Sequence, residues 1–123
     1  MQSITVVISQ ADEITAQRMA EGLRTHFHRV VLSGVEELPQ NLRKHRASLV
    51  VVDMDIVTIE QIQELSQMFE DVAIICTHHA PDAELYLACV EAGATDCCHT
   101  SDISSIVRAY RSLPLRNRRA VAA

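Results

Sequence analysis

The chain has 123 residues and a mass of 13.7 kDa, which fits one domain with a full core and is too short for two ordinary domains. Aromatic residues make up only 3% of the sequence and Trp is absent, so aliphatic side chains must fill the core. The net charge of −5 excludes a basic footprint for nucleic acid over the whole domain.

The first part of the chain alternates apolar runs with amphipathic stretches. Residues 4–9 read as a buried strand, and apolar residues recur at spacings of three and four from about residue 12 to 27, which predicts an amphipathic helix. Residues 29–32 form a short second strand. Ser33, with Glu36 three residues later, is typical of a capping box and predicts that a second helix opens here. Pro39 falls in its first or second turn, which would delay or distort that start.

The run Ser-Leu-Val-Val-Val-Asp at residues 48–53 is the most informative part of the sequence. A continuous β-branched run fits a strand that is covered on both faces, as in a parallel sheet wrapped by helices. Its first polar residue, Asp53, then lies at the carboxyl end of the strand, where such sheets place ligands and chemistry. Asp53 is therefore the strongest functional candidate.

A third helix follows, because Thr58 and Gln61 repeat the capping pattern before a new amphipathic stretch. Residues 72–77 form a fourth apolar strand. Pro81 suits the first turn of a fourth helix, and Gly93 suits its end.

Residues 95–98 form a fifth short strand, and Ser101 is expected to cap a last helix that Pro114 ends. Five strands alternating with five helices predict an α/β fold, a doubly wound (βα)5 three-layer sandwich with a five-stranded parallel sheet. We expect one domain over residues 1–113. Residues 114–123 form a basic tail, read as a frayed end or as the stub of a linker.

The sequence carries no sign of export. The amino terminus lacks the basic segment followed by a long apolar stretch that marks a signal peptide, and no run approaches the roughly 18 apolar residues that span a bilayer. We therefore expect a cytoplasmic protein without a membrane segment. Because Cys97 and Cys98 are adjacent and nothing indicates secretion, we expect reduced thiols.

With this order of elements, residues 3–113 resemble the receiver domains of bacterial response regulators. Asp53 stands where that family has its phosphoacceptor aspartate, and Thr77 matches the hydroxyl residue that contacts the acyl phosphate. Gly93-Ala94-Thr95-Asp96 is similar to the approach to the family's fifth strand. The resemblance implies a flavodoxin-like (CheY-like) fold with strand order 2-1-3-4-5 and a role in two-component, or phosphorelay, signal transduction.

Four other positions depart from the family pattern. The family ends its first strand in two adjacent acids that hold magnesium, whereas this chain has Ser9 and Gln10, which supply no anionic oxygen. Thr100 takes the position of the family's lysine, and Cys97 takes that of the aromatic switch residue. The resemblance and these departures predict an atypical receiver domain that is not an enzyme and has no cofactor, with impaired or absent magnesium-dependent phosphorylation.

Such a domain would act by protein contact. The resemblance places the contact on the fourth and fifth helices and the fifth strand, where we expect Tyr86, Ala109 and Tyr110 to be exposed. The partner would be another protein or a second copy, including a histidine kinase or an output domain, and neither nucleic acid nor membrane. The alternative is a conventional phosphoacceptor that a histidine kinase phosphorylates on Asp53, with Asp12 or Asp55 recruited to hold Mg²⁺.

A second alternative is a flavodoxin-like domain that binds a small ligand or a metal ion. Thiols and imidazoles, which zinc prefers as ligands, gather at the ends of the fourth and fifth strands. The cluster comprises Cys76, His78, His79, Cys98 and His99. Strand alternation turns half of these side chains to opposite faces and cysteine is commonly buried, which favours a structural role.

Overall fold

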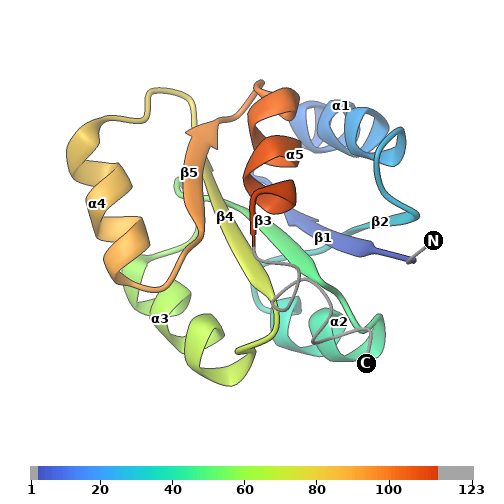
Figure 1. Cartoon of the computed structure of the whole chain (residues 1–123), viewed down its shortest axis with the longest axis horizontal. Helices are drawn as coiled ribbons and strands as arrows, with labels where there is room; N and C mark the ends of the chain where they lie inside the picture. Colours follow the sequence, from blue (N-terminus) through green and yellow to red (C-terminus); the bar gives the residue numbers. More distant parts are fainter. Residues whose placement is uncertain (1–2, 114–123) are drawn as a thin grey trace.

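The computed structural model describes residues 3–113, in which five strands alternate with five helices (Figure 1). The strands are β1 (Thr5–Ser9), β2 (Arg29–Leu32), β3 (Leu49–Asp53), β4 (Ala73–His78) and β5 (Asp96–His99). The helices are α1 (Glu13–Arg24), α2 (Leu38–Lys44), α3 (Ile59–Met68), α4 (Ala83–Glu91) and α5 (Ile103–Arg111). All strand pairs are parallel, in the order β2-β1-β3-β4-β5, which confirms the predicted doubly wound sheet.

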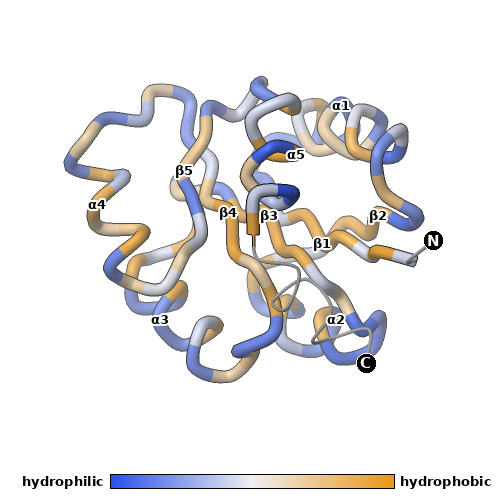
Figure 2. Tube along the Cα trace, viewed as in Figure 1, coloured by the Kyte–Doolittle hydropathy of each residue, from blue (hydrophilic) through white to orange (hydrophobic). Residues whose placement is uncertain are grey.

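The sheet separates two apolar cores, because successive side chains of a strand point to opposite faces. On one face α1 and α5 cover Val6, Ile8 and Val51, and on the other α2, α3 and α4 cover Val7 and Val50. Figure 2 shows the strands as the most hydrophobic segments at the centre of the molecule. The central strands β1 and β3 are buried at every position, which explains their unbroken apolar runs.

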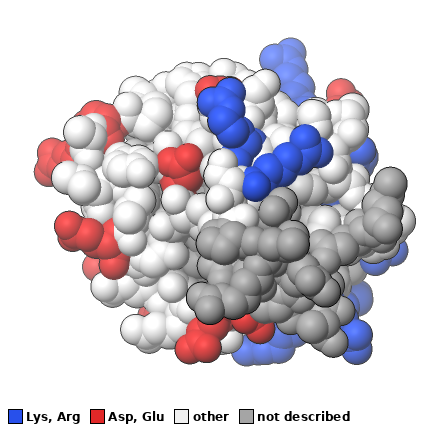
Figure 3. All heavy atoms as spheres, viewed as in Figure 1, with Lys and Arg blue, Asp and Glu red and all other residues white. Residues whose placement is uncertain are grey.

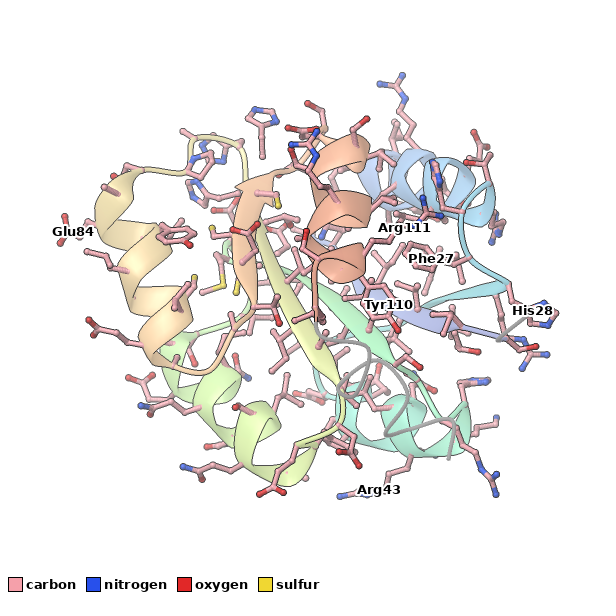
Figure 4. All side chains as sticks on the ribbon, viewed as in Figure 1. Phe27, His28, Arg43, Glu84, Tyr110 and Arg111 are labelled. Carbon is pink, nitrogen blue, oxygen red and sulfur yellow. The ribbon has the colours of Figure 1, made fainter. Side chains whose placement is uncertain are left out.

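Tyr110 belongs to the first of these cores and is only 4% exposed, so the prediction that it lies on an exposed surface was wrong. Its ring packs edge-on against Phe27, with the centroids 5.6 Å apart (Figure 4). Aromatic pairs prefer this geometry. The contact joins α5 to the turn that follows α1.

Two of the predicted helix boundaries are confirmed in detail. Thr58 and Gln61 form a complete capping box at the start of α3, since each side chain accepts a hydrogen bond from the other residue's backbone N–H. Gly93 follows α4 with a φ of 115°, a left-handed conformation that L side chains rarely adopt.

Three other helix starts differ from the prediction. The N-cap of α2 is Glu37, which makes no side-chain capping bond, and Pro39 lies in the first turn. Ser33 instead accepts a hydrogen bond from the Asn41 amide. Pro81 lies just before α4 rather than in its first turn, because Asp82 is the N-cap, and Asp102 rather than Ser101 caps α5. Each of these carboxylates accepts a hydrogen bond from the N3 backbone amide.

The predictions for Pro114 and the basic tail lie outside the described residues. Among the residues that are described, no helix is long and apolar enough to cross a membrane.

Candidate functional site

The carboxyl ends of β1, β3 and β4 meet at one edge of the sheet and bring four polar residues together. Thr77 pairs with Asp53 across the β3–β4 ladder. Ser9, the last residue of β1, lies beside β3, and Gln10 follows it. Ser9 and Thr77 are fully buried and Asp53 is 7% exposed. These four residues, Ser9, Gln10, Asp53 and Thr77, are called the inner site below.

Backbone amides hold the Asp53 carboxylate on both sides. Its Oδ2 accepts a hydrogen bond from the Ala11 N–H at 3.0 Å, and its Oδ1 accepts one from the Asp55 N–H at 2.9 Å. Among the described residues, no Lys or Arg forms an ion pair with it. Asp53 therefore ties the β1–α1 loop to the turn after β3 and uses both oxygens to do so.

Gln10 occupies the space beside Thr77. Its Nε2 donates a hydrogen bond to Thr77 Oγ1 at 2.9 Å, and the hydroxyl in turn lies 3.3 Å from the Val52 carbonyl, to which it donates. Ser9 Oγ and Gln10 Oε1 are buried and have no hydrogen-bond partner among the described residues. The end of β1 thus contributes neutral groups only, and one of them holds the Thr77 hydroxyl.

These residues do not fit a magnesium ion. Magnesium demands near-octahedral oxygen ligands and is usually anchored by carboxylates. The inner site offers a single carboxylate, and both of its oxygens already accept amide hydrogens. The Gln10 Nε2 donates toward the site rather than accepting, so it opposes a cation there.

A cleft of about 520 Å³ opens above the inner site, between α1, the start of α5 and the loops after β3 and β4. Asp53 contributes to its floor and Thr100 to its wall. Asp12, an acid proposed for magnesium, lies in this wall but caps α1, accepting bonds from Thr15 N and Oγ1 at 2.8 and 2.7 Å. These bonds lower the pKa of the Asp12 carboxyl.

Asp55, the other acid proposed for magnesium, meets two histidines at the mouth of this cleft. His78 Nε2 lies 3.3 Å from Asp55 Oδ1, and His79 Nδ1 lies 3.5 Å from Asp55 Oδ2. The two imidazoles stack with centroids 4.3 Å apart. Asp55, His78 and His79 are called the rim. No spacing in the sequence predicted this group, because it depends on side-chain directions in two separate loops.

The cysteine and histidine cluster considered from sequence does not come together as one group. Cys76 packs in the core under α3 and α4, while Cys98 packs on the opposite face under α1 and α5. Burial raises the pKa of Cys76, and burial also raises that of Cys98 to about 12, so both remain neutral thiols. The His99 ring turns to Ser101, whose Oγ lies 2.8 Å from Nδ1.

Cys97, which the resemblance aligns with the family's switch residue, is half-buried, and its side chain packs toward the core under α4. Burial raises the pKa of its thiol to about 12. All four cysteines are free, in agreement with the expectation of reduced thiols. None of them forms a metal-ligating group with other described residues.

A second surface lies on α4, β5 and α5. Tyr86 is 42% exposed, as expected, and sequence reasoning missed Leu87 and Val90 beside it, which are 56% and 37% exposed. Ala109 is half-buried and lines a groove of about 290 Å³ between α4 and α5 together with Tyr86. On the face drawn in Figure 3, acidic side chains lie on the α4 side and basic ones toward α5 and α2.

Comparison with known proteins identifies the fold. No protein-family model matches the chain, and no curated protein matches it by sequence. A response regulator from Thermotoga maritima superposes with a TM-score of 0.80 at 20% identity, over 89% of this chain and 96% of that one. An orphan response regulator of H. pylori superposes with a TM-score of 0.77 at 15% identity, over 89% of this chain and 95% of that one.

A third solved structure is described as an atypical orphan response regulator with a phosphorylation-independent regulatory mechanism. It gives a TM-score of 0.71 at 17% identity and covers 85% of this chain and 90% of that one. The chain therefore has the fold of response-regulator receiver domains, as predicted.

Proposed function

We propose that this chain is an atypical receiver domain that signals by protein contact and does not depend on magnesium or on phosphorylation of Asp53. It is a signalling domain rather than an enzyme. One observation carries the proposal: Asp53 and Thr77 are already hydrogen-bonded within the chain, with Gln10 holding the Thr77 hydroxyl and two backbone amides holding the Asp53 carboxylate.

Phosphoryl transfer in proteins depends on cations that neutralise the developing charge. The inner site supplies only one carboxylate for magnesium, and the resemblance aligns Thr100 with the family's lysine. The solved structure of an atypical orphan regulator with a phosphorylation-independent mechanism provides a precedent on the same fold.

A conventional phosphoacceptor role is the second candidate, because the cleft reaches Asp53. It would need a second acid near the inner site. Asp12 is engaged as the cap of α1, and the carboxylate of Asp55 faces His78 and His79. Each of these acids would have to leave its present partners to bind magnesium.

A magnesium titration separates the two candidates. The backbone amides of Ala11 and Asp55 donate to Asp53, so their nuclear magnetic resonance signals report directly on this carboxylate. We expect no saturable shift below roughly tens of millimolar magnesium, because one carboxylate among neutral groups is a poor site. Saturation at millimolar or lower concentration would favour the phosphoacceptor.

The contact surface would lie on α4, β5 and α5. Exposed Tyr86, Leu87 and Val90 provide apolar area. The adjoining groove contains Arg108 and Asp96, whose charges could orient a bound partner. A second copy of the chain is the simplest partner to test. In sedimentation velocity, Leu87→Asp should lower self-association, whereas Ile14→Asp on α1, 63% exposed, should not. A chain that stays monomeric at every concentration would rule out the homodimer.

A further inference from the structure

We propose that the rim formed by Asp55, His78 and His79 binds a zinc ion. This site differs from a receiver magnesium site in its ligands, in its metal and in its position above the inner site. It is independent of whether Asp53 is phosphorylated.

The geometry supports three-point coordination. One ligand atom from each residue lies within 4.8 Å of the other two. In a tetrahedral zinc site with bonds of roughly 2.0–2.1 Å, neighbouring ligand atoms lie about 3.3 Å apart. The two imidazole contacts to the Asp55 carboxylate measure 3.3 Å and 3.5 Å but reach different oxygens, Oδ1 for His78 and Oδ2 for His79. A rotation of this half-exposed carboxylate is therefore needed to bring one oxygen to a tetrahedral position.

The three residues differ in how far their side chains are exposed. His78 closes β4 and its side chain is 23% exposed, so the sheet holds it in place. Asp55 and His79 are 50% and 70% exposed, and small rotations of these side chains can close the remaining distance. The cleft beside Asp55 and His79 leaves a fourth position open to water.

The ligand set selects the metal. Two imidazole nitrogens and one carboxylate oxygen suit zinc and its neighbours, whereas magnesium prefers oxygen ligands alone. The buried cysteines do not compete, since their neutral thiols point into the two cores. We therefore expect zinc to bind and magnesium to leave the rim unchanged.

Binding requires a change of tautomer at His78. Its Nδ1 accepts a hydrogen bond from the Ala80 N–H at 3.0 Å, so the proton of the neutral ring lies on Nε2 and points to Asp55. When Nε2 coordinates zinc, the ring proton moves to Nδ1 and the Ala80 bond breaks. The Ala80 amide then turns to solvent, which makes its signal a specific reporter of coordination through Nε2.

A bound zinc ion would join the turn after β3 to the loop that leads into α4. The first of these segments also supplies an amide to Asp53, and the second carries the N-cap of α4. Zinc therefore offers a ligand-controlled link between the inner site and the α4 contact surface. Since it would bind the folded chain only, it should also raise the unfolding temperature.

The experiment is a zinc titration of the full chain without a histidine tag, followed by calorimetry and by the Ala80 amide signal. We expect one equivalent of zinc, a shifted Ala80 amide, and no response to magnesium. Asp55→Asn and His79→Ala should each weaken zinc affinity by at least about tenfold. His99→Ala is the matched control, because this histidine lines the same cleft but turns to Ser101, and it should bind zinc like the parent.

Cobalt substitution identifies the ligands. Nitrogen and oxygen coordination should give a spectrum without the thiolate charge-transfer band that cysteine ligands produce. Zinc binding that survives both Asp55→Asn and His79→Ala, a thiolate band, or the absence of any saturable zinc binding would each overturn the proposal. Loss in the rim variants together with retention in His99→Ala would establish it.

Discussion

The inner site and the rim adjoin at the ends of β3 and β4, yet they use their polar groups in opposite ways. The inner groups are mostly buried, and the main contacts of Gln10, Asp53 and Thr77 are to one another or to nearby backbone. The rim groups are half-buried to exposed, and their imidazoles face a carboxylate. The Asp53 carboxylate is thus engaged by backbone hydrogen bonds, whereas the rim side chains reach solvent.

This difference bears on conformational switching. Gln10 Nε2 and the Val52 carbonyl already hold the Thr77 hydroxyl, so no phosphate is required to keep it in place. The domain should then remain in one conformation unless a ligand binds two conformations with different affinity. In the described part of the chain, the rim and the α4 surface are the places where we expect such ligands.

The largest effect is expected from introducing the family's two acids and its lysine into the inner site and beside it. Ser9→Asp, Gln10→Asp and Thr100→Lys together should create magnesium binding and phosphorylation of Asp53 by a small phosphodonor, neither of which we expect of the parent chain. Without metal, uncompensated acids at this buried edge should lower the free energy of unfolding by about 3–5 kcal/mol. Magnesium at about 100 times its Kd should restore about 2.7 kcal/mol.

The matched control for that variant carries Asp53→Asn in addition, and it should bind magnesium weakly and accept no phosphate. A folded triple variant that binds no metal would mean that Ser9 and Gln10 do not correspond to the family's acid pair. Intact mass and urea unfolding with and without magnesium give both results.

Asp53→Asn is the next largest expected effect. The amide can accept only one of the two N–H groups that now point at the carboxylate, and its NH2 faces the other donor. We expect the free energy of unfolding to fall by about 1.5–3 kcal/mol, more than a lone strand-end acid would lose.

Asp55→Asn serves as the control for Asp53→Asn, because its side chain is half-exposed. Stabilisation of Asp53→Asn in urea unfolding would instead indicate that Asp53 is held under electrostatic strain, as a functional acid often is.

A double-mutant cycle tests the hydrogen bond between Gln10 and Thr77. Thr77→Val keeps the shape of the side chain and removes the hydroxyl that accepts Gln10 Nε2. With Gln10→Ala as the second change, the coupling energy from urea unfolding should be about 0.5–1.5 kcal/mol. A coupling energy near zero would mean that the Gln10–Thr77 hydrogen bond does not stabilise the fold, and the proposed function would lose its main support.

Substitution of Asp12 should have the smallest effect on stability, and only at acidic pH. Its pKa is lowered from 3.8 by the hydrogen bonds from Thr15, so its contribution to stability is present above about pH 4 and is lost as the pH falls through the folded-state value. Asp12→Asn keeps the cap and should flatten the pH dependence of unfolding in this range while changing little at pH 7. If Asp12→Asn also removed a magnesium response of the parent chain, Asp12 would be a ligand and not only a cap.

The sequence predicted the fold because its strongest signals are local. The apolar run before Asp53, the Thr58–Gln61 capping box and Gly93 each fix one element without help from distant residues. The misplaced helix starts at Pro81 and Ser101 have a common cause. In both helices the aspartate that follows is the N-cap, so Pro81 lies just before α4 rather than in its first turn, and Ser101 lies just before the cap of α5.

The candidate site was predictable only in part. The resemblance to receiver domains implied that Asp53 and Thr77 lie together, and the β3–β4 register pairs them. The contact from Gln10 to Thr77 passes over β3, and the meeting of Asp55 with His78 and His79 depends on rotamers in two loops. Residue spacing in the sequence predicts neither the Gln10–Thr77 contact nor the rim. The cysteines separated because alternation along β4 and β5 points them to opposite faces.

The most direct test of the central claim is intact-mass measurement of the parent chain after incubation with a small phosphodonor and magnesium. Because Gln10 holds Thr77 and two backbone amides hold Asp53, we expect an unchanged mass at every magnesium concentration. A stoichiometric phosphoryl adduct that maps to Asp53 and is absent from Asp53→Asn would contradict it and make the chain a conventional phosphoacceptor.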